Sequence, residues 1–483
     1  MQLVLSLPPI DEAQVEGDAA DWLFHKVAGV PLLVRVIATA WKSGCTSALL
    51  LHPKSLSGED LKHRLRSGLL SSFRIEALPF DHRFDQNSPS DWKSIESQLE
   101  PRFLWLPWNY VADRRLLKQM VAAGQRSRAG VRLTLPEGST STAMPVVVVK
   151  ERLNLNGQLS HYLDDSSLEK VIDREAPGWP VHSWQTARMA EQGLVRRSGK
   201  EWDGIYSKFN RWLCRPLVRW LSKTPITPNM VTFTGLPISM LSGYWFARGH
   251  WGAYVAGALL YFATVLVDEI DGMLARTTFR ESAFGCWLES FVDYATYVPL
   301  FGGMTLGLTR QFGSRWMGLG LLLLFGTAMT CWVAVRHRKV STSPDRPEQY
   351  LPRYFRLLEG DSGNILSKFV RQAHMFLKKG VLCHYVVIFS VVGALPVFFC
   401  MAVFGSNLAW LLGLYTGRLF SAPSPVGGAV PNPFQSKMLG QQYLLAFQAE
   451  PVRKDSYEHF RFTTEVPNVE LIAPNDVFVP GTR

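Results

Sequence analysis

The sequence predicts a chain of two parts: an α/β domain with a mostly parallel sheet, then an all-α polytopic membrane domain of six transmembrane helices. Up to about residue 225 the apolar runs are short, with the length of a strand or of one helix face. From there to about residue 420 they lengthen toward the ~20 residues that a helix needs to span a bilayer. The length of 483 residues also exceeds what one ordinary core accommodates.

The composition narrows the class of protein. The net charge is +11, but the excess Lys and Arg lie largely beside apolar segments, which favours a membrane topology over nucleic-acid binding. The 6 cysteines have no CxxC or His-paired spacing, so they predict neither a disulfide framework nor a zinc site. The N-terminus "MQLVLSLPPIDEAQ" lacks a basic region and a full apolar region, so we expect no signal peptide.

Residues 1–155 alternate short β-rich runs with helical stretches, an order that is typical of βαβ units and a mostly parallel sheet. The runs are, in order, "LVLSL", "PLLVRVIATAWKSG", "SALLLH", "FRIEALP", "RFLWLP", "DRRLLKQMVAAG" and "VRLTLP". They predict an α/β domain over 1–155. The polar residues 156–204 are expected to form a connector with some helix.

The segment "IYSKFNRWLCRPLVRWLSK" predicts a basic amphipathic helix that lies on a membrane surface, within residues 205–225. Its basic residues recur every three or four positions and its apolar residues supply another side: Lys208, Arg211, Arg215 and Arg219, and Phe209, Trp212, Leu213, Leu217 and Trp220. A soluble helix with a solvated charged face is the alternative. Pro216 is a position at which the helix can break.

The membrane domain is expected over 226–420. Its helices are predicted at 229–248, 251–275, 285–308, 315–335, 381–402 and 405–420. Ten basic residues fall between 336 and 379, whereas the loops on the other side carry only Arg248, Arg310 and Arg315. By the positive-inside rule both termini are cytoplasmic, in a multi-pass protein of the inner, cytoplasmic membrane. The Pro-rich polar tail, 421–483, shows no motif.

The stretch "DEIDGMLARTTFRESAFGCWLESFVD" places carboxylates beside two apolar segments, where uncompensated charge is costly. Asp268 and Asp271 are three residues apart, and Glu289 and Asp293 are four apart, so each pair shares one helix face. An antiparallel hairpin brings both pairs to one level at the cytoplasmic face. Convergent carboxylates repel one another unless cations neutralise them, and hard oxygen ligands select Mg²⁺ or Mn²⁺, here two ions. The alternative is that the carboxylates only pair with nearby arginines.

The residues around these carboxylates suit phosphoryl transfer. Gly272, Ala275 and Gly285 leave room for a ligand to approach the backbone, and Arg276 can hold a phosphate. The spacing D-x2-D-G-x2-A-R-x8-G-x3-D-x3-D resembles the motif of the CDP-alcohol phosphotransferases (CDP-alcohol phosphatidyltransferases). Glu289 stands where that family has Asp. "KTPITPNMVT" is similar to the family's lead-in segment, with Pro228, Asn229 and Thr232 at its usual positions.

The resemblance, over about 200–420, implies an integral-membrane enzyme. It would transfer a phosphoalcohol group from a CDP-linked donor, either CDP-diacylglycerol or a CDP-linked polar alcohol, to an acceptor hydroxyl, with release of CMP. It implies that Asp268, Asp271 and Glu289 hold the metal pair, that Asp293 binds metal or acts as general base, and that the protein is a homodimer. It also implies that the donor binds at Gly272, Ala275, Arg276, Gly285, Pro228, Asn229 and Thr232. Arg336, Arg338 and Lys339 could bind a phosphorylated acceptor, or serve only as topology signals.

The α/β domain resembles the nucleotidyltransferase fold, a Rossmann-type sheet, of inositol-phosphate cytidylyltransferases that are fused to such membrane modules. "AGVPLLVRVIATAWKSG" and "KEWDGIYSKFNR" are the similar segments. However, "PPIDEAQVEGD" stands where a phosphate-cradling Gly-rich loop is expected, and Asn109 stands where a metal-binding Asp is expected. We therefore expect a degenerate, non-catalytic domain. A membrane scaffold without activity, and a bifunctional enzyme with an active cytidylyltransferase domain, remain the alternatives.

Overall fold

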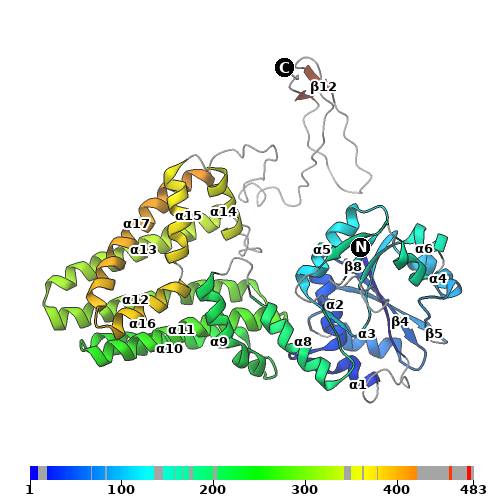
Figure 1. Cartoon of the computed structure of the whole chain (residues 1–483), viewed down its shortest axis with the longest axis horizontal. Coiled ribbons are helices and arrows are strands. Elements are labelled where there is room, and N and C mark those ends of the chain that lie inside the picture. Colours follow the sequence, from blue (N-terminus) through cyan, green and yellow to red (C-terminus); the bar gives the residue numbers. More distant parts are fainter. Residues whose placement is uncertain are drawn as a thin grey trace. The chain divides into compact units, whose positions relative to one another are not determined.

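The computed structural model shows two compact units, residues 1–334 with 361–414, and residues 335–360 with 415–483 (Figure 1). Each is described by itself. The structure describes the chain apart from the following residues: 9–18, 67, 82–83, 135–144, 157, 166, 173–177, 200–203, 342–349, 362–363, 378, 421–455, 460–475 and 480–483.

The first unit begins with an α/β domain built on a seven-stranded sheet of order β10-β8-β9-β6-β1-β4-β5. The pairs β1–β4, β1–β6, β4–β5 and β8–β10 are parallel, whereas β9 runs antiparallel to both neighbours. The predicted mostly parallel sheet is therefore confirmed. Its strands are β1 (Gln2–Ser6), β4 (Ser47–Pro53), β5 (Arg74–Phe80), β6 (Arg102–Trp105), β8 (Val131–Thr134), β9 (Val146–Val149) and β10 (Glu169–Ile172).

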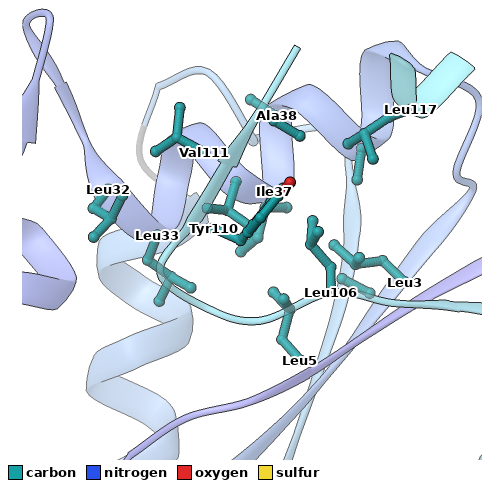
Figure 2. Packing of buried hydrophobic residues seen from close by; sticks show 14 of the residues in the cluster. Leu3, Leu5, Leu32, Leu33, Ile37, Ala38, Leu106, Tyr110, Val111 and Leu117 are labelled. Carbon is teal, nitrogen blue, oxygen red and sulfur yellow. The ribbon is translucent and has the colours of Figure 1, made fainter. Parts of the chain in front are cut away.

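Helices cover both faces of this sheet. Along β1, Leu3 and Leu5 belong to one buried apolar cluster and Val4 to a second, because successive side chains of a strand point to opposite faces. Figure 2 shows the first cluster, in which Leu3 and Leu5 lie near Ile37 and Leu117. The helices are α1 (Ala19–Phe24), α2 (Leu32–Lys42), α3 (Gly58–Arg66), α4 (Pro89–Ile95), η1 (Glu96–Gln98), α5 (Arg114–Arg126), α6 (Lys150–Asn156), α7 (Leu159–Asp164) and α8 (Trp184–Arg197).

Two strands of the sheet were not singled out in the sequence. β9 is a run of four valines, and β10 comes from the segment that was expected to be a connector. Short antiparallel pairs complete the domain: β2 (Lys26–Val27) with β3 (Val30–Pro31), and β7 (Tyr110–Ala112) with β11 (Gly178–Pro180). The turn after β1, with the "PPIDEAQVEGD" segment, lies almost entirely outside the described residues.

The helical part of the chain begins with α9 and continues with long apolar helices. Its helices in the first unit are α9 (Ile205–Leu221), α10 (Pro228–Ala247), α11 (Trp251–Thr278), α12 (Ala283–Phe312), most of α13 (Arg315–Ser341), α15 (Ile365–Leu377), α16 (Lys379–Val391) and most of α17 (Leu395–Thr416). α10 contacts both α11 and α12 (Figure 1). Its Gly243 approaches α12 so closely that a Cβ on Gly303 would lie 2.3 Å from the Gly243 carbonyl oxygen.

In the part of the chain that the structure describes, three helices are long and apolar enough to cross a membrane: Trp251–Thr278, Arg315–Lys339 and Leu395–Leu419. α16 is a shorter apolar helix of 13 residues. At 1.5 Å per residue it measures about 20 Å, less than the ~30 Å of a hydrocarbon core. The coarser prediction, a helical domain with candidate membrane spans, is confirmed by these three.

The predicted boundary between the last two helices is wrong. The sequence predicts helices at 381–402 and 405–420, but the structure ends a helix at Val391 and runs α17 unbroken from Leu395 to Thr416. Gly393 has a φ of +76°, and its N–H and that of Ala394 donate to carbonyls of the last turn. Pro396 follows in the first turn of α17, where a missing N–H costs nothing.

α9 packs one side against α11 and exposes the other. The helix continues through Pro216. Most of the predicted apolar side is exposed, but Arg211 of the basic set is buried and its Nε lies 2.7 Å from Glu269 Oε2 on α11. The basic residues of α9 therefore do not form a single solvated face.

The second unit contains the end of α13 and the end of α17. Tyr354 Oη and Thr416 Oγ1 form a buried hydrogen bond of 2.9 Å within it. Its further elements are α14 (Tyr350–Gly360), η3 (Gly417–Phe420), and the antiparallel strands β12 (Ser456–His459) and β13 (Asp476–Val479).

Candidate functional site

The four predicted carboxylates lie on two helices joined by a short turn. α11 ends at Thr278, and Phe279 follows with a φ of +57°. The side chain of Ser282 then caps α12 by accepting a hydrogen bond of 3.0 Å from the Gly285 N–H. α11 and α12 each pack against α10.

Asp271 is the most buried of the four, with 3% of its surface exposed. The hydroxyl of Thr232 on α10 donates to its Oδ2 over 2.5 Å. Oδ1 is buried and has no hydrogen-bond partner among the described residues. A buried carboxylate oxygen without a partner is costly, so this atom is suited to a ligand that brings positive charge.

Asp268 and Asp293 share one ammonium group. Nζ of Lys379, the first residue of α16, donates to Asp293 Oδ1 and lies 3.9 Å from Asp268 Oδ2. This contact shows that α11 and α12 bring their carboxylates together, as the hairpin argument predicts. The Lys379 side chain is 11% exposed, against 25% for Asp268 and 30% for Asp293.

Glu289 completes the cluster from α12. It is half-buried, and together with Asp268 and Asp293 it lies close enough to Asp271 for the charges to repel. Lys379 thus contacts two of the four carboxylates, Asp268 and Asp293, and Glu289 also lies near the Arg276 guanidinium, so the four carboxylates outnumber these two cations.

The donor set fits a hard divalent cation, which prefers carboxylate oxygens. The unpartnered Asp271 Oδ1 and the excess of carboxylates over ammonium groups are the observations that support this fit. Within the described ranges, no group of three or more His, Cys, Asp and Glu side chains already has the arrangement of a metal site.

The small residues of the motif mark close approaches. A Cβ on Gly285 would lie 2.9 Å from Asn229 Oδ1, so the start of α12 and the start of α10 meet there. A Cβ on Gly272 would lie 3.1 Å from the Arg276 guanidinium. The Nε of Arg276 donates to the Ser198 carbonyl over 2.5 Å. Ala275 lies one position before it on α11.

The start of α10 adds the other predicted donor-binding residues. Pro228 occupies its first turn, after the N-cap Thr227, and Thr232 follows one turn later. Through Thr232 this segment reaches Asp271 directly. Arg336, Arg338 and Lys339 lie on the last turns of α13, in the second unit.

Lys379 is the residue of the site that sequence reasoning missed, because it was counted only among the basic residues that set topology. A lysine directly before the apolar run "GVLCHYVVIF" was the available signal.

Residues 225–350 match the family model described as CDP-alcohol phosphatidyltransferase. The chain therefore carries a CDP-alcohol phosphatidyltransferase domain. Asp268, Asp271, Glu289 and Asp293 all fall inside this range.

Curated relatives carry related names. "Archaetidylinositol phosphate synthase" of Pyrococcus horikoshii is 35% identical over 106 residues, which are 21% of this chain and 55% of that protein. "Bifunctional IPC transferase and DIPP synthase" of Aquifex aeolicus is 22% identical over 349 residues, 65% of this chain and 78% of that protein. The chain thus spans little more than half of the archaeal relative.

Among solved structures, one from Bacillus anthracis, provisionally described as a glucose-1-phosphate thymidylyltransferase, is 12% identical. It covers 39% of this chain and 93% of that chain, with a TM-score of 0.30. The strand order of its sheet, and not this likeness, defines the α/β domain.

Proposed function

We propose that this chain transfers a phosphoalcohol group from a CDP-linked donor to an acceptor hydroxyl and releases CMP, in the synthesis of a phospholipid or a related phosphodiester. The observation that carries the proposal is the convergence of the motif carboxylates of α11 and α12, inside a segment that matches the CDP-alcohol phosphatidyltransferase model. The names of the archaeal and bacterial relatives support it.

In the proposed reaction the acceptor hydroxyl oxygen attacks the phosphorus that bears the alcohol. A new P–O bond forms, the bond to the bridging oxygen of the diphosphate breaks, and CMP leaves with the electron pair. Asp293 takes the hydroxyl proton as general base. Lys379 favours the charged form of Asp293, which is the form that accepts a proton.

Mg²⁺ or Mn²⁺, two ions by this proposal, would be held by Asp268, Asp271 and Glu289, with Asp293 beside them. Such cations neutralise the negative charge of a diphosphate and stabilise its leaving oxygen. Thr232 orients Asp271 by its hydrogen bond, so that Oδ1 faces the ligand.

The donor would bind beside the small residues of the motif, where neighbouring groups lie close to the helix backbone. Gly272 lets the Arg276 guanidinium lie against α11, where it can hold a phosphate, and Gly285 lets Asn229 approach the start of α12. Pro228, Asn229, Thr232 and Ala275 complete the proposed donor site. A phosphorylated acceptor would bind Arg336, Arg338 and Lys339. The donor is either CDP-diacylglycerol or a CDP-linked polar alcohol.

We further propose a homodimer that crosses the inner, cytoplasmic membrane six times, through α10, α11, α12, α13, α16 and α17. Three of these meet the length and hydropathy of a span, and the concentration of basic residues at 336–379 favours cytoplasmic termini and a cytoplasmic active site. α9 would lie at the membrane surface. Reporter fusions at residues 312 and 360 should report opposite sides; the same side would contradict this topology.

For the remaining regions we propose a division into the α/β domain 1–155, the connector 156–204, which adds β10 to the sheet of that domain, the interfacial segment 205–225, the membrane domain 226–420 and the tail 421–483. The α/β domain is proposed to be non-catalytic, because its sequence lacks a Gly-rich phosphate loop after the first strand. Release of pyrophosphate from CTP by the full chain, with any polyol or sugar phosphate, would contradict this.

The experiment that tests the main proposal uses the purified full chain, a panel of CDP-alcohols and hydroxyl acceptors, and a measurement of CMP release with and without Mg²⁺. We expect release from one donor class, only with the divalent cation. Absence of release across the panel would favour a scaffold derived from the family.

A further inference from the structure

The α/β domain contacts the helices of the candidate site at the end of α11. Arg35 of α2 is 1% exposed, and its guanidinium donates to the Thr277 carbonyl over 2.9 Å. The same guanidinium donates to the carbonyls of Val27 at 3.0 Å and Ala28 at 3.2 Å, within the α/β domain. One side chain thus joins a turn of this domain to the last turn of a helix that carries two of the carboxylates.

The Thr277 carbonyl belongs to the last turn of α11, where carbonyl groups have no partner within the helix. A cation at this end also complements the helix dipole. Burial lowers the pKa of the Arg35 guanidinium to about 9, against the attraction of Glu191, which raises it. A charged side chain buried in this way is tolerated only where its hydrogen bonds are made, so the contact is specific.

The turn between α11 and α12 is anchored in the same domain. Phe279 has a φ of +57°, a conformation that is rare for a bulky residue and that surrounding contacts must maintain. Its ring is 9% exposed and belongs to the apolar core cluster of the α/β domain. The Arg35 guanidinium carbon lies 5.3 Å from the centre of this ring.

A second contact reaches the segment that leads into α10. Gly29 has a φ of +79°, and a Cβ there would lie 1.8 Å from the Ser222 carbonyl oxygen. Glu191 of α8 accepts from the Ala28 N–H at 3.1 Å and from Lys223 Nζ at 2.8 Å. The α/β domain therefore holds both the lead-in to α10 and the end of α11.

We propose that Arg35 is a positioning residue: through Thr277 and Phe279 it holds the end of α11, and with it Asp268 and Asp271, in register with the carboxylates of α12. Asp271 lies fewer than two helical turns before Thr277, and a helix transmits a displacement of its end as a nearly rigid body. The α/β domain then holds the helices of the transferase site in position. This inference rests on the proposed function for its effect on rate, but not for its effect on structure.

The test compares the full-length protein with Arg35→Met, which keeps the length of the side chain and removes its donors. Hydrogen exchange of residues 272–289 should become about tenfold faster, while β1 and β4 exchange as in the unchanged protein. Mn²⁺ should bind severalfold more weakly. CMP release should fall by about 10- to 100-fold, since a displacement of about 1 Å is enough for such a loss. Arg35→Lys retains the positive charge but not the planar set of N–H donors of the guanidinium, so it should show an intermediate effect.

The matched control is Arg114→Ala. It removes an ion pair of 3.1 Å with Glu281, at the same turn but with side chains 48% and 36% exposed, and it should change none of these quantities appreciably. Phe279→Ala provides the second variant if Arg35→Met unfolds the α/β domain, because it leaves no buried charge behind. It should accelerate exchange at 272–289 in the same way.

The decisive variant is whichever one keeps the α/β domain folded. If hydrogen exchange at 272–289 and Mn²⁺ affinity are both unchanged in that variant, the positioning role of Arg35 is wrong. Both measurements need no turnover, so they remain decisive if the unchanged protein releases no CMP from any donor. In that case the proposed function fails while the positioning role of Arg35 is still tested.

Discussion

Asp268 and Glu269 are neighbours on α11, yet they lie in opposite kinds of charge environment. Glu269 forms an ion pair with Arg211 of α9, 2.7 Å apart, with side chains 13% and 7% exposed. Asp268 shares the single ammonium of Lys379 with Asp293, and Asp271 and Glu289 lie beside them. Glu269 therefore has a guanidinium partner of its own, whereas the second group holds several carboxylates around one ammonium.

This difference shows what distinguishes a structural acid from a ligand in this helix. An acidic residue in an apolar segment is not by itself a sign of a cation site, because Glu269 satisfies its charge within the protein. The excess of charge and the unpartnered Asp271 Oδ1 are the distinguishing features. The predictions below test this difference between Glu269 and the motif carboxylates.

The largest effect is expected from Asp293→Asn. The amide cannot take a proton, so CMP release should fall by about 10²–10⁴-fold, the usual contribution of general-base catalysis. Mn²⁺ affinity should fall much less, since the other carboxylates remain. Steady-state rates and Mn²⁺ titration measure the two quantities separately. A near-native rate would remove Asp293 from the mechanism.

Glu269→Gln should remove the negative charge that lies 2.7 Å from the buried Arg211. We expect a loss of roughly 3 kcal/mol in the free energy of unfolding, as for other broken buried pairs. Mn²⁺ affinity should be unchanged. Thermal unfolding in detergent and Mn²⁺ binding test both statements. A strong loss of Mn²⁺ affinity would mean that Glu269 also contributes to the cation site.

Lys379→Met should make the excess of negative charge larger. Because a cation that competes for the same carboxylates is removed, Mn²⁺ should bind about tenfold more tightly. The metal-free protein should melt at a lower temperature, because Asp268 and Asp293 then repel each other without compensation. Lys54→Met is the matched control, since Lys54 pairs with Asp81 at an exposed position of the α/β domain, outside the site. Weaker Mn²⁺ binding in Lys379→Met would show that the lysine assists the metal instead of competing with it.

The smallest effect is expected from Glu289→Asp. The substitution keeps the carboxylate and restores the residue of the family pattern, so CMP release should stay within about threefold of the unchanged protein, or rise. Glu289→Gln, which removes the charge at nearly constant size, is the control and should lose activity. Equal rates for both variants would indicate that Glu289 is not a ligand.

Much of this arrangement could be predicted from the sequence. The apolar runs and the carboxylate spacing located α11 and α12, because helix periodicity is a local property. The contact of Asp271 with Thr232 agrees with the lead-in segment and the acidic motif belonging to one site. The β-rich runs likewise predicted β1, β4, β5, β6 and β8, but neither β9 nor β10.

Other features depend on contacts between residues far apart in the chain. The sequence does not predict that Lys379 contacts Asp293, or that Arg35 contacts Thr277. The spacing of the acidic motif selects Asp268 and not Glu269, but the partner of each is set by tertiary packing. The end of α16 was a local feature that could have been predicted, since Gly393 and Pro396 form a recognisable stop and start.

The central claim is that the unbalanced carboxylates form a metal-dependent transferase site, and Asp271→Asn tests it most directly. Mn²⁺ binding and Mg²⁺-dependent CMP release should be measured on the same preparations of the unchanged protein and the variant. We predict that the unchanged protein binds Mn²⁺ and releases CMP, and that Asp271→Asn loses metal and donor binding together, because its buried ligand oxygen is replaced. Equal Mn²⁺ affinity and equal CMP release in the two proteins would contradict the assigned site.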